Sequence, residues 1–225
     1  MKVVLFGATG MVGQGVLREC LLDPEIEHVL TVGRSATGQQ NAKLEELVHK
    51  DFLDFSTTEE RLFGYDACFF CLGVSSVGMS EHEYERVTYG YTMAAAQTLS
   101  RLNPGMTFEY ISGMGTDSSQ RGRSMWARVK GKTENALLKL PFKAVYVLRP
   151  GFIQPMHGIK SKTGLYQAMY TILAPLYPIW RVLLPNFVTT TEQLGRVMIV
   201  IAKKGAPKQV LEVRDIRGLE EPSQG

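Results

Sequence analysis

Residues 2–13, KVVLFGATGMVG, decide how the rest of the sequence is interpreted. Lys2–Phe6 is a short apolar run, which is typical of a strand buried in a parallel sheet. Gly7, Gly10 and Gly13 then form the pattern G-x-x-G-x-x-G. Met11–Leu22 follows with apolar residues at helical spacing. A strand, a glycine-rich turn and a helix therefore open the chain.

This turn has the composition of a phosphate-binding loop. Gly7 permits a tight turn, Gly10 lets a pyrophosphate approach the main chain, and Gly13 lets the helix pack close to the strand. The following helix N-terminus offers free N–H groups and the positive end of its dipole to phosphates. We therefore predict a dinucleotide site here, against the alternative of a glycine-rich turn with no ligand. The predicted contacts are Gly7, Thr9, Gly10, Met11, Val12 and Gly13.

Composition describes an ordinary globular protein. The 225 residues are 44% hydrophobic and 21% charged, which excludes a disordered or collagen-like chain. A net charge of +3 is too balanced for a nucleic-acid binder. Three cysteines do not suit a secreted disulfide scaffold, and the apolar run after Lys2 is too short for a secretory signal. We therefore expect a cytoplasmic protein.

Strand and helix patterns alternate along most of the chain, which predicts right-handed βαβ units and a doubly wound parallel sheet of Rossmann type. Expected strands are Lys2–Phe6, His28–Val32, Leu44–His49, Tyr65–Leu72, Met106–Ser112, Ala144–Leu148 and Gln209–Arg214. Expected helices are Met11–Leu22, Ser56–Phe63, Glu81–Leu102, Ser124–Leu140 and a last one to Lys203, with Ser56 and Thr189 as caps. We predict one domain over 1–225, with 154–189 as a mostly helical substrate-side cap and 220–225 as a loose tail.

The end of the second strand indicates which dinucleotide binds. An NAD site usually has a carboxylate there, to bind the ribose 2′-hydroxyl. This chain has Gly33-Arg34-Ser35 instead. A guanidinium with a neighbouring hydroxyl suits a 2′-phosphate. We favour NADP over NAD, with Arg34 and Ser35 as contacts; an ordinary surface arginine that tolerates NAD is the alternative.

Several motifs together resemble a known superfamily. They are the loop GATGMVG, Arg34 after the second strand, Ser112 after the fifth, Lys130, and Arg149–Phe152 after the sixth. Over residues 1–155 the chain resembles the short-chain dehydrogenase/reductases. The atypical branch with NmrA-like and Tat-interacting-protein-like oxidoreductases, often described as epimerase-like, is the most similar. The resemblance implies an NADP(H)-dependent oxidoreductase.

The resemblance also implies roles for individual residues. Asp51 would bind the adenine amine with Phe52 beside it, and Lys130 would bind the nicotinamide ribose. Ser112 would orient a substrate carbonyl, which makes Ser112 and Lys130 the predicted catalytic pair. The adenosine side would be lined by Cys71, Leu72 and Gly73, and the nicotinamide side by Pro150, Gly151, Phe152 and Ile153.

One position departs from the superfamily pattern Tyr-x-x-x-Lys. The sequence reads Trp126-Ala127-Arg128-Val129-Lys130, and no tyrosine lies between Ser112 and Leu140. An indole N–H donates a hydrogen bond but is no general acid at neutral pH. Three accounts stay open: His157 supplies the proton, water supplies it slowly, or the chain is a silent NADP(H)-binding regulatory or redox-sensing protein. A lone histidine such as His157 is more often structural.

Residues 165–184, LYQAMYTILAPLYPIWRVLL, approach the length of a membrane span. Pro175 and Pro178 favour two short buried or dimer-forming helices instead, with peripheral membrane contact left open. This apolar segment predicts a small hydrophobic carbonyl or quinone-like substrate, or else a protein partner. A monomer or a homodimer is expected, and no nucleic acid.

Three other patterns in the sequence are weaker indications of function. Cys68 and Cys71 spell C-x-x-C, but residues three apart in a strand point to opposite faces, so we expect a structural role and no metal site. Ser112 lacks the preceding glycine of a hydrolase nucleophile turn. A basic cluster either attracts the anionic dinucleotide or is a solvated face; it comprises Arg121, Arg123, Arg128, Lys130 and Lys132.

Overall fold

The computed structural model describes residues 1–159 and 187–219. Its centre is a seven-stranded sheet in the order β3-β2-β1-β4-β5-β6-β9, and every neighbouring pair is parallel. The strands are β1 (Lys2–Phe6), β2 (His28–Gly33), β3 (Leu44–Val48), β4 (Ala67–Phe70), β5 (Thr107–Ile111), β6 (Ala144–Arg149) and β9 (Val210–Glu212). The order reverses between β1 and β4, which is where open α/β sheets bind their ligands. The predicted doubly wound parallel sheet is confirmed.

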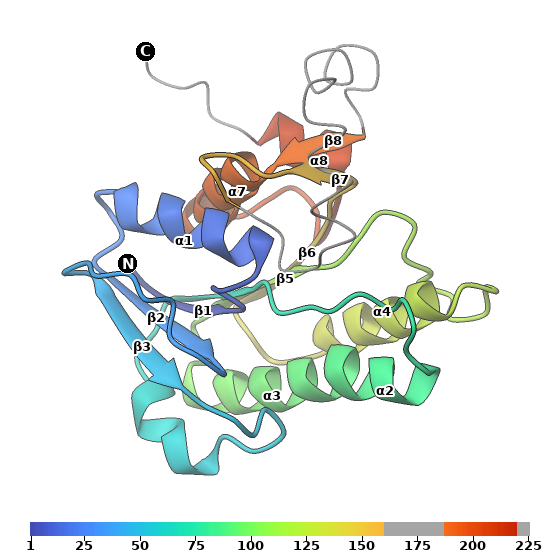
Figure 1. Cartoon of the computed structure of the whole chain (residues 1–225), viewed down its shortest axis with the longest axis horizontal. Helices are drawn as coiled ribbons and strands as arrows, with labels where there is room; N and C mark the ends of the chain where they lie inside the picture. Colours follow the sequence, from blue (N-terminus) through green and yellow to red (C-terminus); the bar gives the residue numbers. More distant parts are fainter. Residues whose placement is uncertain (160–186, 220–225) are drawn as a thin grey trace.

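Helices cover both faces of the sheet (Figure 1). On one face α1 (Met11–Leu22) packs beside α7 (Thr191–Lys204). On the other face lie α3 (Thr92–Leu102) and α4 (Met125–Leu137). The remaining turns are a 3-10 helix η1 (Ser56–Leu62), the short α2 (Glu81–Glu85), a π-helical turn η2 (Arg86–Tyr91) and α8 (Val213–Gly218).

The alternation of side chains along β4 confirms the interpretation of the C-x-x-C pattern. Cys68 is buried in the core beneath α3 and α4, whereas Cys71 packs against the core beneath α1 and α7. The two thiols therefore lie on opposite faces of the sheet, as a period of two requires. Burial raises the pKa of both thiols, which is the behaviour of inert core cysteines.

Two predicted helix caps are wrong. The hydroxyl of Ser56 caps no helix: the segment is a 3-10 helix whose N-cap is Phe55, with no side-chain cap. The last helix begins one residue later than predicted. Its cap is Thr190, whose Oγ1 accepts from the N–H of Gln193 (2.9 Å).

The predicted strand Gln209–Arg214 is wrong in its second half. It is the three-residue strand β9 followed at once by α8. The switch occurs because Asp215 Oδ2 accepts from the N–H of Glu212 (2.8 Å) in a capping box. The sequence also failed to predict a small second sheet, in which β7 (Phe152–Gln154) pairs in parallel with β8 (Val188–Thr190).

Part of the C-terminal prediction lies outside the described residues. This applies to 160–186 of the cap, including the apolar segment 165–184, and to the tail 220–225. The described ends of the cap, 154–159 and 187–189, begin and finish on β7 and β8. Among residues 1–159 and 187–219, no helix has the length and apolar character needed to cross a membrane.

Candidate coenzyme and substrate site

The turn after β1 has the tight geometry predicted for a phosphate loop. Gly7 has φ +80°, and its carbonyl oxygen accepts from the N–H of Gly10 (2.9 Å). A Cβ added at Gly13 would lie 2.1 Å from that same oxygen, so only glycine lets α1 start this close to the strand. Gln14 Nε2 donates to the Thr9 carbonyl (3.2 Å) and fixes the middle of the turn.

The N-terminus of α1 suits a bound pyrophosphate. Its N-cap is Gly10, which provides no side-chain cap, and the first turn has no acidic residue. Met11 and Val12 begin the helix there, so their main-chain donors face outward with the positive end of the dipole. A dinucleotide fits these residues, because the donors that a capping side chain would otherwise occupy are left open.

The turn also brings the end of β4 against β1. A Cβ at Gly7 would lie 2.6 Å from the Leu72 main-chain nitrogen and 2.7 Å from the Cys71 carbonyl carbon. Cys71 and Leu72 are partly buried and Gly73 is open, with nothing within 4 Å of a Cβ there. The structure therefore places these three predicted adenosine-side residues at the point where the strand order reverses.

At the end of β2, Arg34 and Ser35 are exposed. Within 1–159 and 187–219, the Arg34 guanidinium has no ion-pair partner, so its donors are available to a ligand. His49, after β3, donates its main-chain N–H to the Gly33 carbonyl oxygen (2.9 Å). This contact brings the loop that carries Asp51 beside the end of β2. Asp51 is exposed as well, and its Oδ1 accepts from the N–H of Leu53 (3.0 Å).

The side chain of Phe52, predicted beside Asp51 at the adenine, lies in the core. Its ring is 1% exposed and packs edge-on against Phe6 (6.3 Å) and Phe55 (5.9 Å). The side chain belongs to the aromatic core beneath the sheet, where a large apolar ring gains most from burial. Only the main chain of Phe52 is left for an adenine.

Lys130 projects from α4 toward the end of β5. Its Nζ lies 3.4 Å from the Tyr110 hydroxyl and 3.4 Å from the Ile111 carbonyl oxygen, and 5.1 Å from the centre of the Tyr110 ring. Burial lowers the pKa of Lys130 to about 8, against the opposing charge of Glu134. Burial likewise raises the pKa of Tyr110, so the phenol stays neutral beneath the cation.

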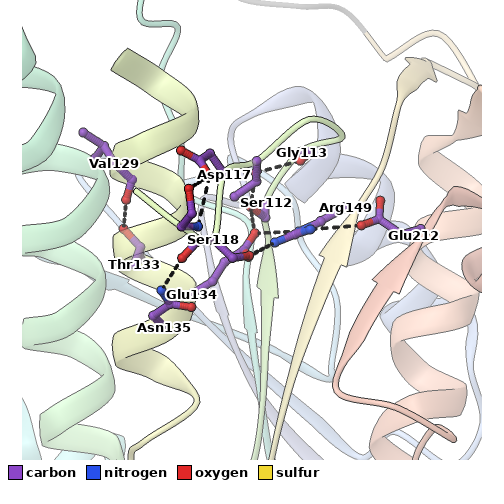
Figure 2. Close-up of polar contacts among 12 residues, drawn as sticks. Ser112, Gly113, Asp117, Ser118, Val129, Thr133, Glu134, Asn135, Arg149 and Glu212 are labelled. Atoms are coloured by element: carbon purple, nitrogen blue, oxygen red, sulfur yellow. Dashed lines mark hydrogen bonds and ion pairs between the residues drawn. The ribbon is translucent and has the colours of Figure 1, made fainter. Parts of the chain in front are cut away.

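Ser112, directly after β5, is tied into a buried ion pair (Figure 2). Its hydroxyl donates to Glu134 Oε1 and lies 3.1 Å from Thr116 Oγ1. Glu134 is 1% exposed, and Arg149 donates to both of its oxygens, from Nε (3.1 Å) and from Nη2. The structure thus gives the Ser112 hydroxyl a partner within the protein, where a substrate carbonyl was predicted.

Arg149 connects four parts of the fold at this point. Besides Glu134 on α4, it donates to Glu212 Oε1 at the end of β9 (3.0 Å) and to Ser118 Oγ in the loop after β5 (2.6 Å). The hydrogen bonds to Glu134 raise the pKa of Arg149. Glu134 lies one helical turn after Lys130, so one face of α4 carries both groups.

The chain after β6 lies beside the same loop. The Pro150 carbonyl accepts from the N–H of Met114 (2.9 Å). A Cβ at Gly151 would lie 2.3 Å from the Phe187 carbonyl oxygen, which in turn accepts from the N–H of Phe152 (2.8 Å). Ile153 follows in β7, so the predicted nicotinamide-side residues sit next to the Ser112 loop.

No family model matches the chain. Protein FMP52-2, mitochondrial, of Scheffersomyces stipitis is 29% identical over 152 residues, which are 66% of this chain and 65% of that protein. Protein FMP52, mitochondrial, of Meyerozyma guilliermondii is 23% identical over 98% of this chain and 93% of its own length. Protein HTATIP2 of Rattus norvegicus is 28% identical over 68% of this chain and 62% of its own length. The matched region is thus less than two thirds of two of these relatives.

Solved structures agree on the architecture. The dTDP-glucose 4,6-dehydratase DesIV of Streptomyces venezuelae, with NAD and TYD bound, superposes with a TM-score of 0.70 and 13% identity, covering 97% of this chain and 80% of that one. A UDP-N-acetylglucosamine 4-epimerase of Methanobrevibacter ruminantium gives 0.69 and 13%, covering 93% and 74%. The chain has the short-chain dehydrogenase/reductase fold. The resemblance predicted from the sequence is confirmed.

At the position of the superfamily's tyrosine, the Trp126 indole covers the loop after Ser112. Its ring atoms lie 3.8 Å from a Cβ added at Gly113 and 3.6 Å from one added at Gly115. The indole therefore occupies space beside this loop and brings no titratable proton to it. Lys130, the residue predicted as the lysine of the superfamily pair, lies four residues after Trp126 on the same helix face.

His157 has a structural partner. Its Nε2 lies 2.7 Å from Glu192 Oε2 at the start of α7. Although burial raises the pKa of Glu192, the His157 hydrogen bond and the Arg196 charge hold it below its ordinary value. His157 also borders a groove along α1 with Gln14 and Arg18. It thus lies on the α1/α7 face, and Lys130 on the other.

The basic cluster predicted from the sequence divides into separate roles. Arg128 pairs with Glu81 (2.7 Å) and Lys132 pairs with Glu85, so both attach α4 to α2. Arg121 and Arg123 are exposed in the loop before α4. Lys130 alone of the five is turned into the protein beside the candidate site.

Sequence reasoning missed Glu134 and the role of Arg149 as its partner. The four-residue spacing of Lys130 and Glu134 was a usable signal, because it puts both on one helix face. Arg149 was recognised only as part of the motif Arg149–Phe152. Nothing in the sequence links these two to Ser118 and Glu212.

The prediction of a cytoplasmic protein is wrong. The FMP52 relatives from Scheffersomyces stipitis, Meyerozyma guilliermondii and Candida albicans are named as mitochondrial proteins. The prediction failed because an odd cysteine count indicates only a reducing environment, which does not single out one compartment.

Proposed function

We propose that this chain binds NADP(H) across the carboxyl edge of its sheet, at the junction of β1 and β4. The observation that carries the proposal is the open N-terminus of α1, which follows a glycine turn and has neither a capping side chain nor an acid in its first turn. In this proposal the diphosphate is bound by main-chain donors between Thr9 and Val12. The adenosine lies along Asp51 and residues 71–73, and the nicotinamide beside 150–153.

The preference for NADP(H) over NAD(H) rests on Arg34 and Ser35. Both are exposed at the end of β2, and the guanidinium forms no ion pair within 1–159 and 187–219, so it can bind a 2′-phosphate. The solved neighbour DesIV holds NAD, so the 2′-phosphate contact is proposed for this chain from Arg34 and Ser35.

The reaction we propose is the interconversion of a small apolar carbonyl or quinone-like compound and its alcohol. The bound coenzyme would supply or accept the hydride. Lys130 would bind the nicotinamide ribose, and a Lys130 pKa of about 8 keeps its charge adjustable near neutral pH. The substrate side offers exposed apolar side chains from the loops after β4 and β5, namely Val74, Val77 and Met114.

A second candidate is a silent NADP(H)-binding regulatory or redox-sensing protein. Trp126 favours it, because an indole stands where the superfamily has its proton donor. The buried partner of Ser112 favours it too, since that hydroxyl is not free to polarise a carbonyl. Both candidates need the same coenzyme site and differ only in turnover.

Titration with NADPH and with NADH, followed by quenching of tryptophan fluorescence, tests the coenzyme site. We expect NADPH to bind at least tenfold more tightly, and Arg34→Ala to remove that preference. Arg121→Ala, an exposed arginine in the loop before α4, is the matched control and should change neither affinity. Equal affinity of the wild type for both coenzymes would refute the role of Arg34.

Turnover separates the two candidates. Wild-type protein that oxidises NADPH with simple ketones or quinones is an enzyme, and the silent candidate is then excluded. If activity appears only in Trp126→Tyr, the parent chain is a silent binder with an otherwise competent site. Trp180→Tyr is the matched control for loss of a tryptophan.

A further inference from the structure

We propose that Ser112 accepts a hydrogen bond from the molecule bound at the substrate side of the site and does not donate one. Of a carbonyl compound and its alcohol, this chain would therefore hold the alcohol more tightly. The inference rests on the proposed function for the identity of the site. It names which member of the substrate couple the site recognises.

The first step is the state of Glu134. This carboxyl group is 1% exposed, and the Arg149 guanidinium donates to both of its oxygens from Nε and Nη2. A two-pronged guanidinium contact is the arrangement of an ionised carboxylate, which can only accept hydrogen bonds. In the contact between Ser112 Oγ and Glu134 Oε1, the serine must then be the donor.

The second step is a count of hydroxyl protons. Ser112 and Thr116 carry one each. The Thr116 hydroxyl donates to the Gly113 carbonyl oxygen (2.7 Å), and the Ser112 hydroxyl donates to Glu134. Both hydroxyl protons are thus already used, and the 3.1 Å contact between Ser112 Oγ and Thr116 Oγ1 adds no third proton. What Ser112 has left for a ligand is its oxygen lone pairs.

The third step compares the two bonds that could compete for the Ser112 proton. A hydrogen bond to an ionised group is roughly twice as strong as one between neutral groups. To bind a ketone oxygen, the Ser112 hydroxyl would have to turn its proton away from the buried Glu134 carboxylate. Glu134 Oε1 would then lose one of its hydrogen-bond donors. An alcohol can instead donate to Ser112 Oγ, so the existing bond stays intact.

The Ser112–Glu134 bond can be tested in the protein without any ligand. We expect Ser112→Ala and Glu134→Gln to be coupled in urea unfolding, with the double variant destabilised about tenfold less in its unfolding constant than the two single effects predict. Ser100→Ala in α3 is the control partner and should be additive with Glu134→Gln. Additive behaviour of Ser112→Ala would overturn the inference.

The ligand preference is tested with two compounds that cannot react in the NADP⁺ complex. Cyclohexanone cannot be reduced by the oxidised coenzyme, and 1-methylcyclohexanol has no carbinol hydrogen to lose. We expect the alcohol to bind about five- to tenfold more tightly, as one neutral hydrogen bond allows, with Trp126 fluorescence as the readout. Ser112→Ala should abolish the difference and leave NADP⁺ affinity unchanged, whereas Ser100→Ala should preserve it.

The outcomes separate the two proposals. Tighter binding of cyclohexanone, or a preference that survives in Ser112→Ala, overturns the inference while coenzyme binding stands. Failure to bind NADP⁺ refutes the proposed function, and the unfolding cycle still decides whether Ser112 donates to Glu134. Should Glu134→Gln not fold, the comparison of Ser112→Ala with Ser100→Ala decides through the ligand pair, which can also be titrated without coenzyme. A merely structural serine would alter stability and leave the preference for the alcohol in place.

Discussion

The two halves of the candidate site differ in how far they keep the pattern of the superfamily. On the adenosine side, the glycine turn, the uncapped start of α1 and the exposed Arg34 are all open to a ligand. On the nicotinamide side, Trp126 covers the loop after β5 and Ser112 donates to Glu134. Binding of a coenzyme and transfer of a proton therefore depend on different residues, and one can be altered without the other.

The largest effect should come from the ion pair under the nicotinamide side. Arg149→Met leaves Glu134 as an unpaired charge that is 1% exposed. Breaking a buried pair in this way costs about 3–5 kcal/mol of unfolding free energy. Urea unfolding measures the loss.

The matched control is Arg101→Met, which removes an exposed partner of Glu59. Exposed pairs contribute about 0–1 kcal/mol, so this variant should unfold nearly like the wild type. If the two methionine variants lose similar stability, the nicotinamide side is not organised around Arg149.

The adenosine side should respond to a single methyl group. Gly13→Ala places a Cβ 2.1 Å from the Gly7 carbonyl oxygen, so α1 has to move away from the turn. We expect NADPH affinity to fall about a hundredfold, which corresponds to roughly 2.7 kcal/mol. Gly105→Ala is the control, because nothing lies within 4 Å of its added Cβ. Unchanged affinity in Gly13→Ala would show that the diphosphate is bound elsewhere.

A smaller effect of opposite sign should come from Lys130. Burial lowers its pKa to about 8 from the ordinary lysine value of 10.5, so the folded state disfavours the charge. The resulting penalty is present at pH 7 and fades as pH rises from about 8 toward 10.5, because only the unfolded chain is then still protonated. We expect Lys130→Met to stabilise the protein by about 1–2 kcal/mol at pH 7 and to weaken NADPH binding.

Unfolding curves at pH 7 and at pH 10 measure this effect, and the gain in Lys130→Met should shrink at the higher pH. Lys132→Met, on the same helix, removes the partner of Glu85 and should bring no gain. A stabilised Lys130→Met that binds NADPH as well as the wild type would remove Lys130 from the coenzyme site.

Local patterns predicted most of the fold. Hydrophobic periodicity over a few residues was enough to predict β1, β6 and α1, because each of these elements is specified by its own local pattern of apolar residues. The pairing of β7 with β8 was not predictable, because each strand has three residues and their partners lie far apart in the chain. The start of α8 at Val213 was not predicted, because it depends on a single capping box within a segment whose apolar residues indicated a strand.

The part of the candidate site that the main chain forms could be predicted from the sequence. The part that depends on contacts between side chains was less predictable. The glycine turn follows from which residues tolerate its geometry, so Gly7 and Gly13 could be assigned functions from the sequence. The partner of Ser112 could not, because Glu134 and Arg149 meet only after α4 packs on the sheet. The burial of the Phe52 ring was not predictable for the same reason, since its neighbours come from the folded core.

The most direct test of the account is a crystal structure of the chain with NADP⁺ bound. We predict that the diphosphate lies at the start of α1, within hydrogen-bond distance of main-chain nitrogens between Thr9 and Val12, with the 2′-phosphate against Arg34. A coenzyme bound at any other place, or a cleft that excludes it at saturating concentration, would contradict the central claim.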